Sequence, residues 1–249
     1  MTVRRALITG ASSGIGTAAA LELARSGAAV WITYTGRQAE AARVAEECIE
    51  AGAPDARVSR LDLRDPASIT SLVDEITQEW GSLHVLVNNG GVCPYTGYDD
   101  IGIDEWDLVL ETNARGTFLL TRAALPLLRA AEGDRSVVNV ASIAGQVGAL
   151  QTGMHYAASK GALLAITRSF ARHLASEGIR VNAVTPGPVA SAITDQLSTE
   201  GRAKLEAGIP LGDFGQPADV AWIIASLASD RARFITGATY DVNGGVRID

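Results

Sequence analysis

The sequence predicts an α/β fold: a single-domain, Rossmann-type, doubly wound parallel sheet of about seven strands with helices on both faces. Three observations predict it. Short apolar runs of strand type alternate with helical patterns along the chain, which is typical of a parallel sheet covered by helices. The first apolar run leads directly into a glycine-rich turn and a helix. No linker, low-complexity stretch or fixed-period repeat interrupts the 249 residues, so we expect one domain over residues 1–249.

The elements are predicted in a regular order. Strands are expected at residues 3–9, 28–34, 56–61, 83–87, 135–140, 179–184 and 239–242. Helices are expected at residues 17–25, 38–51, 66–80, 104–129, 155–177 and 217–229. Gly27 stops the first helix, and Pro66 suits the first turn of the third. Gly116 and Pro126 are the candidate positions for a bend in the long helix 104–129.

Composition and charge narrow the class of function. Hydrophobic residues make up 47% of the chain and charged residues 20%, as in ordinary globular proteins. The net charge of −7 argues against non-specific binding of nucleic acid. We find no run of about 18 apolar residues and no signal-peptide pattern, so a cytoplasmic protein without a membrane span is expected. Cys48 and Cys93 are expected to be free thiols, and no metal site is predicted.

The glycine-rich turn is a candidate nucleotide site. It comprises Gly10, Ser12, Ser13, Gly14, Ile15 and Gly16. Glycines let a backbone approach a pyrophosphate closely, and the N-terminus of the following helix offers free N–H groups and a partial positive charge. The spacing Gly-x-x-x-Gly-x-Gly differs from the dinucleotide fingerprint G-x-G-x-x-G. A tight turn without a ligand is therefore the alternative.

The end of the second strand indicates the choice of cofactor. Folds that bind NAD carry an acidic residue about 20 residues after the glycines. Here the strand ends at Tyr34, and no carboxylate appears before Glu40. Arg37 lies where a 2′-phosphate would arrive, and its planar guanidinium suits phosphate. These features favour NADP (NADPH) over NAD, with a solvated Arg37 at the start of a helix as the alternative.

Tyr156 and Lys160 lie four residues apart on the apolar stripe of helix 155–177. Residues at this spacing are neighbours on a helix. A cation within about 4–6 Å lowers the pKa of a phenol from about 10, so we expect Tyr156 to be tuned toward neutrality as a general acid or base. The spacing alone is a weak motif, and a surface Lys beside a core Tyr is the alternative.

Further polar residues are expected at the same place. Asn113 lies on the apolar stripe of helix 104–129, where a buried amide needs a specific partner. Asp62, Asn88-Asn89, Ser142 and Pro186-Gly187 each follow a predicted strand directly. Ligands of open α/β sheets bind beyond the carboxyl ends of the strands. We therefore expect these residues along one edge of the sheet, together with the glycine turn.

Taken together, these motifs resemble those of the short-chain dehydrogenase/reductase superfamily, in the same order and over nearly the whole chain. The matching residues are Thr9-Gly10-x-x-x-Gly14-Ile15-Gly16, Asp62, Asn88-Asn89-Gly90-Gly91, Asn113, Ser142, Tyr156-x-x-x-Lys160 and Pro186-Gly187. The segments Ile-Pro-Leu-Gly at 209–212 and Phe-Gly-Gln-Pro at 214–217 are similar to those of the 3-oxoacyl-thioester and related ketone reductases.

The resemblance implies a role for each catalytic residue. Tyr156 would donate the proton to the carbonyl oxygen, and Ser142 would orient that oxygen. Lys160 would lower the pKa of Tyr156 and hold the nicotinamide ribose. Asn113 would distort its helix and hold a water in a relay to Lys160. Beyond the glycine turn, the implied cofactor site comprises Tyr34, Arg37, Asp62, Leu63, Asn89, Gly90, Tyr156, Lys160, Pro186, Gly187, Val189 and Ser191.

The expected function is NADPH-dependent reduction of a ketone, either 3-oxoacyl or another small ketone, to a secondary alcohol by a dinucleotide-binding catalytic domain. An NAD-linked alcohol or sugar dehydrogenase is one alternative, and a non-catalytic nucleotide-binding scaffold is another. Three departures from the family pattern are present. Gly90 replaces the usual Ala, a small change that should keep the cofactor contact, and Asp213 stands where the most similar reductases often carry a basic residue. Carrier-protein reductases also tend to show basic patches near the site, whereas here Glu177 ends its helix and the net charge is negative. These features weaken a carrier-bound substrate and favour a free ketone.

Three further expectations concern the surroundings of the site. Residues 190–208 are predicted to form a substrate lid. The opposite wall is expected to comprise Gln146, Val147, Gln151, Met154 and His155. A homotetramer is expected from small residues that permit close helix packing, with the apolar tail packing on another subunit. The residues concerned are Ala157, Ala158, Gly161, Ala162 and Ala165 on the helix, and Val246 and Ile248 in the tail.

Overall fold

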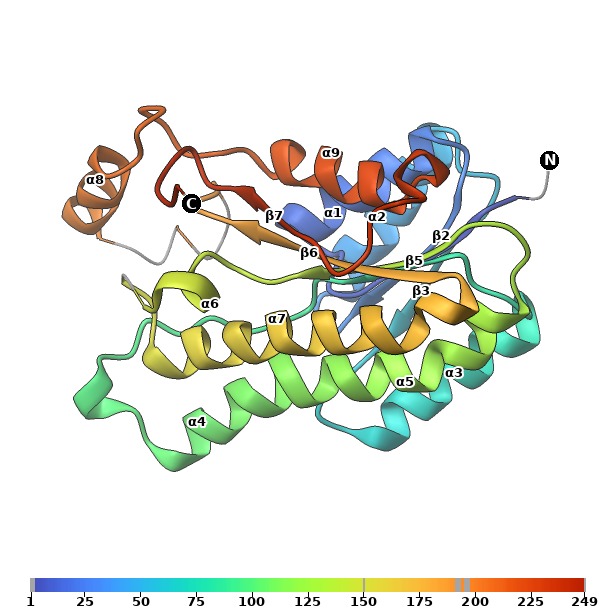
Figure 1. Ribbon diagram of the computed structural model, residues 1–249, viewed down its shortest axis with the longest axis horizontal. Helices are drawn as coiled ribbons and strands as arrows, with labels where there is room; N and C mark the ends of the chain where they lie inside the picture. Colours follow the sequence, from blue (N-terminus) through green and yellow to red (C-terminus); the bar gives the residue numbers. More distant parts are fainter. Residues whose placement is uncertain (1–2, 150, 191–193, 195–197, 249) are drawn as a thin grey trace.

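A parallel sheet forms the centre of the molecule (Figure 1). The structure is a computed structural model that describes residues 3–149, 151–190, 194 and 198–248. Within the described residues the sheet has seven strands in the order β3-β2-β1-β4-β5-β6-β7, all paired in parallel. The strands are β1 (Arg5–Ile8), β2 (Ala29–Tyr34), β3 (Ala56–Arg60), β4 (Val85–Asn88), β5 (Arg135–Val140), β6 (Ile179–Pro186) and β7 (Thr239–Val242). The predicted fold class is confirmed.

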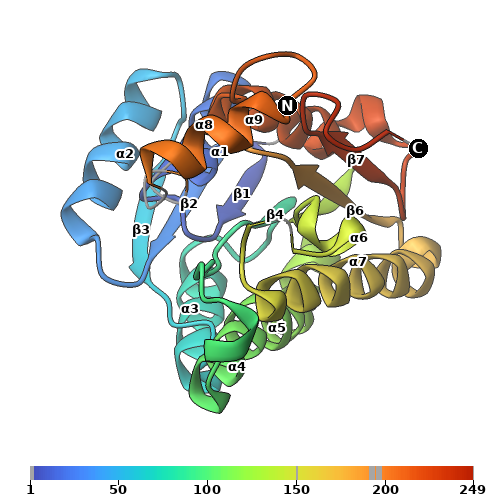
Figure 2. The same cartoon turned by 90° about the vertical axis from the view of Figure 1, so that its left-hand side faces the viewer.

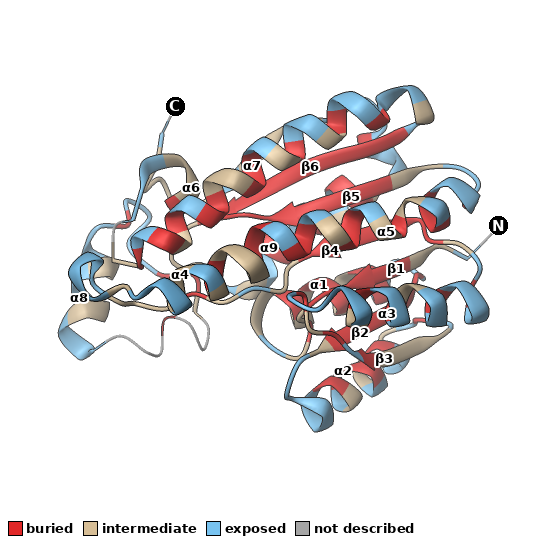
Figure 3. Cartoon of the chain, turned by 90° about the horizontal axis from the view of Figure 1, so that it is seen from below, coloured by how far each residue is buried: buried red, intermediate tan, exposed pale blue. Residues whose placement is uncertain are grey.

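Helices cover both faces of this sheet. They are α1 (Gly14–Arg25), α2 (Gln38–Glu50), α3 (Pro66–Glu79), α4 (Ile103–Leu110), α5 (Thr117–Ala130), α6 (Ala144–Val147), α7 (Met154–Leu174), α8 (Thr199–Ala207) and α9 (Pro217–Ala228). Helices α1, α2 and α9 lie on one face, and α3, α5 and α7 on the other (Figure 1). Successive side chains of a strand point to opposite faces, so Ala6 and Ile8 join the first core while Leu7 joins the second. The inner strands are accordingly buried over most of their length (Figure 3). The edge strands β3 and β7 are mostly half-buried.

The order of the strands creates the site. The chain moves outward from β1 to β2 and β3, then returns to β4 on the other side of β1. The loops that leave β1 and β4 therefore diverge, and such a switch point is where open α/β sheets bind ligands. Figure 2 views this end of the sheet, with α6, α8 and the start of α7 around it.

The long helix predicted over residues 104–129 is interrupted. Helix α4 ends at Leu110, a π-helical segment spans Glu111–Gly116, and α5 begins at Thr117. A side chain at Gly116 would collide with the backbone carbonyl of Leu63, so the helix lies tightly against the loop after β3. The irregularity lies at Gly116, one of the two positions named for a bend, whereas Pro126 lies inside α5 without ending it. A bend itself stays a prediction.

Other boundaries also differ from the predictions. Helix α1 begins at Gly14 rather than at residue 17, because Gly10 and Gly14 adopt positive φ angles of 63° and 58° and complete the turn early. The short helix α6 was not predicted. Within the described residues, no helix is long and apolar enough to cross a membrane.

The opposite end of the sheet is held by a buried ion pair. Arg180 donates to Asp134 Oδ1 at 2.9 Å and to Asp134 Oδ2 at 2.8 Å. The same guanidinium donates to the carbonyl of Leu227 at 2.8 Å. It therefore joins the loop before β5 to the C-terminus of α9.

Candidate active site

Two hollows open at the carboxyl edge of the sheet, and they share the residues Ile15, Asn89, Gly91, Val92 and Cys93. We call the hollow beside the glycine turn the outer groove and the one around Ser142, Tyr156 and Lys160 the inner cavity. Because the two hollows share these residues, they lie next to each other at this edge.

Most of the predicted cofactor residues line the outer groove. They are Gly10, Ser12, Ser13, Gly14, Ile15, Tyr34, Arg37, Asp62, Leu63, Asn89 and Gly90. Gly16 does not line it, but a Cβ there would lie 2.6 Å from both the Gly10 carbonyl oxygen and Asn89 Nδ2. Gly16 therefore allows α1 to pack closely against the turn. Ser13, at the N-cap of α1, makes no side-chain capping hydrogen bond.

Asn89 fixes the shape of the glycine turn. Its Nδ2 donates to the carbonyl oxygens of Thr9 and Gly10 at 3.0 Å and 3.1 Å. Thr9 Oγ1 in turn accepts from the backbone N–H of Asn89 at 3.0 Å and of Gly90 at 2.8 Å. The glycine turn is thus held by the loop after β4, the neighbouring strand in the sheet. The N-terminus of α1, which has no side-chain cap, suits the pyrophosphate of a dinucleotide.

Gly90, the departure from the usual Ala, lies in a tight position. A Cβ on Gly90 would be 3.2 Å from Thr9 Oγ1 and 3.3 Å from Leu63 Cδ1. At Gly91 a Cβ would lie 2.8 Å from Asn113 Oδ1. Gly91 is therefore the more restrictive of the two positions.

The far end of the outer groove carries two arginines. Arg37 is exposed at the N-cap of α2 and lines the groove. Arg64, which the sequence analysis missed, binds Asp62 through both carboxylate oxygens, with NH2–Oδ2 at 2.8 Å and Nε–Oδ1 at 3.1 Å. Hydrogen bonding to Arg64 holds the pKa of Asp62 below its ordinary value. The signal that could have revealed Arg64 is its position two residues after Asp62, on the same strand-end loop.

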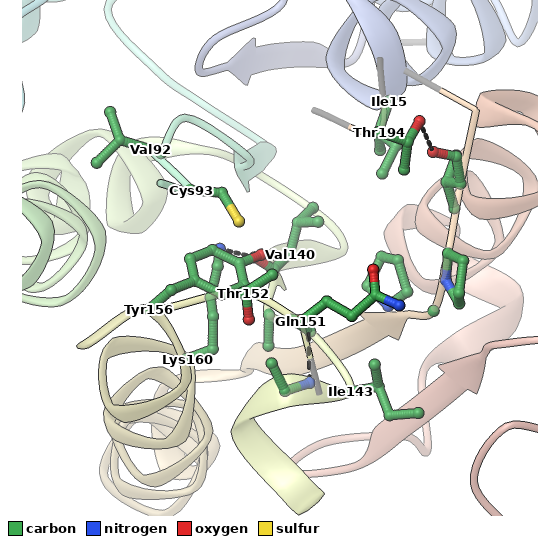
Figure 4. A pocket seen from close by; sticks show the side chains of 18 of the residues that line it. Ile15, Val92, Cys93, Val140, Ile143, Gln151, Thr152, Tyr156, Lys160 and Thr194 are labelled. Atoms are coloured by element: carbon green, nitrogen blue, oxygen red, sulfur yellow. Dashed lines mark hydrogen bonds between the residues drawn. The ribbon is translucent and has the colours of Figure 1, made fainter. Parts of the chain in front are cut away.

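In the inner cavity, Lys160 and Tyr156 lie close together on the first turns of α7 (Figure 4). Lys160 is buried, its Nζ donates to the Val140 carbonyl at 2.8 Å, and it lies 5.6 Å from the centroid of the Tyr156 ring. Ser142 Oγ accepts from the Ala144 N–H at 3.1 Å. The structure thus brings the three predicted catalytic side chains into one cavity.

The pKa of Tyr156 moves opposite to the expected direction. Loss of contact between the phenol and bulk water raises it, and the neighbouring Cys93 thiol adds to the rise, while hydrogen bonding with Ser142 opposes it. Burial also lowers the pKa of Lys160 from 10.5 to about 8. Since desolvation by burial is the largest cause of this shift, the expectation of a lowered tyrosine pKa is wrong. At neutral pH the phenol is protonated, which is the form that donates a proton.

Asn113 lines neither hollow and lies behind the inner cavity, in the π-helical segment. Its Oδ1 accepts from the Val92 N–H at 2.9 Å, and its Nδ2 donates to the Val92 carbonyl at 2.8 Å and to Ser159 Oγ at 3.1 Å. The buried amide has the specific partners expected of it, and they are protein groups. A water relay from Asn113 to Lys160 stays a prediction.

The loop after β6 completes the floor of the inner cavity. Pro186, Gly187 and Val189 line it as predicted. A Cβ on Gly187 would lie 2.7 Å from Asn243 Cα, so this loop packs tightly against the C-terminal tail. The predicted Ser191 lies outside the described residues.

The predicted substrate wall is mostly wrong. Gln151 lines the inner cavity, but Val147 and Met154 are exposed, and Gln146 donates instead to Asp241. His155 is buried on the other side of α7, where Nε2 lies 2.8 Å from Glu105 Oε1. The rotation of α6 and α7 about their own axes decides which of their side chains point into the inner cavity. The predicted lid, residues 190–208, stays a prediction that lies partly outside the described residues.

The sequence analysis missed several lining residues of the inner cavity, among them Cys93, Tyr95 and Thr152. Cys93 and Tyr95 lie two and four residues after Asn88-Asn89-Gly90-Gly91. Their position in the loop after β4, at the carboxyl edge of the sheet, could have indicated that they line the site. Burial raises the pKa of Cys93 and of Tyr95 to about 12. Both groups are therefore neutral at physiological pH.

Comparisons with known proteins agree with this geometry. A family model described as enoyl-(acyl carrier protein) reductase matches residues 10–247. The 3-oxoacyl-(acyl-carrier-protein) reductase FabG of Staphylococcus aureus (strain Mu50) is 41% identical over 245 residues, which is 98% of each chain. An uncharacterised oxidoreductase of Methylorubrum extorquens is 39% identical over 97% of each chain. The L-rhamnose 1-dehydrogenase (NAD(P)(+)) of Azotobacter vinelandii is 38% identical over 98% of this chain and 96% of its own.

Proposed function

The chain belongs to the short-chain dehydrogenase/reductase superfamily, and we propose that it reduces a ketone to a secondary alcohol with NADPH. One observation carries the proposal: a protonated phenol, a serine hydroxyl and a buried ammonium meet in the inner cavity. This cavity adjoins a groove suited to a dinucleotide and shares five lining residues with it. Groups for proton donation and for cofactor binding thus lie side by side.

The outer groove fits a phosphorylated dinucleotide. The glycine turn and the uncapped N-terminus of α1 would hold the pyrophosphate. Arg37 would bind the 2′-phosphate. Asp62, a carboxylate that lines the same groove, is already paired with Arg64. Lys160 and Tyr156 would hold the nicotinamide ribose. The bound NADPH supplies the hydride.

The protein's own part in the reaction is the transfer of a proton. The Tyr156 O–H would donate its proton to the carbonyl oxygen of the substrate, and Ser142 would donate a hydrogen bond to the same oxygen. The phenolate left on Tyr156 would then be stabilised by the Lys160 ammonium, which the Val140 carbonyl holds in place. Asn113 would support this arrangement by fixing the Val92 backbone and Ser159.

The lining of the inner cavity favours an uncharged, largely apolar substrate. Apolar side chains dominate it, including Val92, Ile143, Val189 and Leu205. Among the described residues, no Asp, Glu, Arg or His lines it. The apolar part of this lining supports a 3-oxoacyl compound or another neutral ketone over a sugar, because hydroxyls buried against apolar side chains cost free energy. The likeness to a rhamnose dehydrogenase keeps NAD(P)-linked sugar oxidation as the second candidate.

A substrate panel tests the proposal. Purified protein and a Tyr156→Phe variant would be assayed for NADPH oxidation with acyl thioesters, 3-oxoesters and cyclic ketones, and for NAD reduction with L-rhamnose. We expect turnover of a neutral ketone that the variant loses by at least about a hundredfold. Equal rates for the two proteins would refute the role of Tyr156. Nucleotide binding without turnover of any compound would indicate a scaffold.

The choice of cofactor has its own test. NADPH and NADH would be titrated by fluorescence against the wild type and an Arg37→Ala variant. A charge-assisted contact is worth about 1.5–3 kcal/mol, or roughly tenfold or more in affinity. We therefore expect a loss of that size for NADPH and little change for NADH. Tight binding of NADH by the wild type would contradict the proposal.

The homotetramer is part of the same proposal. Exposed aromatic side chains lie on two separate faces. Phe118 of α5 stacks on Phe170 of α7 at 5.8 Å, while Trp222 of α9 and Phe234 are 62% and 98% exposed. Apolar patches on two faces suit two different two-fold contacts. Light scattering at micromolar concentration should give about four times the chain mass of 25.9 kDa, and a mass near that of one chain would refute it.

A further inference from the structure

Asp241, on β7, accepts hydrogen bonds from two segments that are distant in the sequence, α6 and the end of β6, and from the C-terminal tail six residues after it. Gln146 Nε2 donates to Oδ1 at 2.9 Å, and Thr185 Oγ1 donates to the same oxygen through a short contact. Arg247 NH1 donates to Oδ2 at 2.6 Å. A carboxylate can accept from several donors at once, so one side chain joins α6, the end of β6 and the C-terminal tail.

Two of these segments border the inner cavity, since Ala144 of α6 and Pro186 at the end of β6 line it. Gln146 belongs to α6, which begins two residues after Ser142. Thr185 directly precedes Pro186 and Gly187, both of which line the cavity. Movement of either donor would therefore displace groups that contact the substrate or the cofactor.

The third segment reaches the other side of the cavity through the tail. The Leu211 N–H donates to the Gly244 carbonyl at 3.1 Å. A Cβ on Gly244 would lie 2.6 Å from Ile209 Cγ2, so the tail and the segment after α8 are in tight contact. Leu205 of α8 lines the inner cavity. The Arg247 ion pair thus anchors the tail on which the base of α8 rests.

The charge state of Asp241 suits this role. Burial alone would raise its pKa, but the hydrogen bonds from Thr185, Gln146 and Arg247 together hold it below its ordinary value. The group is therefore an acceptor on both oxygens at neutral pH. A neutral side chain would leave at least one of the three donors without its partner.

We propose that Asp241 is a positioning residue that holds the two walls of the inner cavity together, with α6 on one side and the C-terminal tail and α8 on the other. The carboxylate touches neither hollow. It acts through the residues that it anchors. The predicted effect on turnover rests on the proposed ketone reduction, whereas the effect on the two walls does not.

The test compares Asp241→Ala and Asp241→Asn with a matched control, Asp74→Asn, an exposed carboxylate on α3. Asparagine keeps one acceptor oxygen for Gln146 and Thr185 but lacks the charge that binds Arg247. Small displacements of reacting groups cost up to about a hundredfold in rate. We expect kcat/KM for the ketone to fall by about ten- to a hundredfold in Asp241→Ala and by less in Asp241→Asn, with Asp74→Asn at the wild-type value.

Two further measurements separate positioning from general destabilisation. The Kd for NADPH should change much less than kcat/KM, by less than about threefold, because the outer groove, which would hold most of the cofactor, makes no contact with Asp241 and only the nicotinamide end would lie near the segments that it anchors. Hydrogen exchange should accelerate in residues 143–148 and 243–248 of Asp241→Ala, while the central strands keep wild-type protection. Gln146→Leu and Arg247→Leu should each accelerate exchange in their own segment only.

The outcomes are distinct. Wild-type exchange in both segments of Asp241→Ala would overturn the proposal, whatever the substrate. A loss of activity that merely follows the unfolded fraction in a thermal melt would also overturn it. If the wild type reduces no ketone, the proposed function fails, and the exchange measurements still decide the role of Asp241.

Discussion

Replacing Lys160 with Met should stabilise the fold at neutral pH and abolish the proposed reductase activity. The fall in the pKa of Lys160 from 10.5 to about 8 corresponds to about 3 kcal/mol of destabilisation at pH 7. Methionine has a similar shape without the charge. It leaves the Val140 carbonyl without the donor now at 2.8 Å, which costs about 1–2 kcal/mol. The free energy of unfolding should therefore rise by about 2 kcal/mol.

The increase in the free energy of unfolding of Lys160→Met over the wild type should become smaller as the pH rises. Between pH 8 and pH 10.5 the unfolded chain binds a proton at Lys160 that the folded chain has released. The wild type is consequently stabilised as pH rises through this window, and Lys160→Met is not. The difference between the two proteins should shrink from about 2 kcal/mol at pH 7 to about zero near pH 9.5.

Urea unfolding at several pH values measures this difference. Both proteins keep Tyr156 and Cys93, whose raised pKa values destabilise the fold at alkaline pH, so these contributions cancel in the comparison. Lys204→Met, at an exposed position on α8, is the matched control. A difference that stays constant from pH 7 to pH 9.5 would show that burial of Lys160 does not perturb its titration.

Two other predictions test the packing. Gly91→Ala would place a Cβ 2.8 Å from Asn113 Oδ1 and should lower kcat/KM by at least about tenfold. Gly90→Ala, with no contact closer than 3.2 Å, should lower kcat/KM less. Equal effects of the two substitutions would contradict the geometry. Asp134→Ala would leave the buried Arg180 without its carboxylate partner. The free energy of unfolding, measured in urea, should fall by about 3–5 kcal/mol. A fall below about 1 kcal/mol would show that the ion pair contributes little.

The parts of the fold that the sequence predicted depend on local patterns. The order of strands and helices follows from hydrophobic periodicity. The glycine turn was recognisable because Gly10 and Gly14 need the positive φ angles that the structure shows. Ser142, Tyr156 and Lys160 could be placed together because the carboxyl ends of parallel strands and the start of α7 meet at one edge.

The remaining features depend on contacts that no local pattern encodes. The direction of the Tyr156 pKa shift is set by how completely the surrounding elements remove water. His155 faces Glu105 rather than the cavity, because the rotation of α7 on the sheet decides which of its side chains point inward. Asp241 meets Gln146 across 95 positions of sequence, so its three donors could be identified only from the folded chain.

The π-helical segment Glu111–Gly116 has a consequence for how this protein can change by insertion and deletion. A π-bulge amounts to one residue more than the regular α-helix would need. Deleting one residue here would allow α4 and α5 to merge into a straight helix. Each residue of an α-helix turns the chain by about 100°, so the deletion would move Asn113 away from Val92 and Ser159. The helix can therefore accommodate the deletion while the candidate active site cannot. Chains that lost this residue should keep the sheet but lack the hydrogen bonds of Asn113 to Val92 and Ser159, behind the inner cavity.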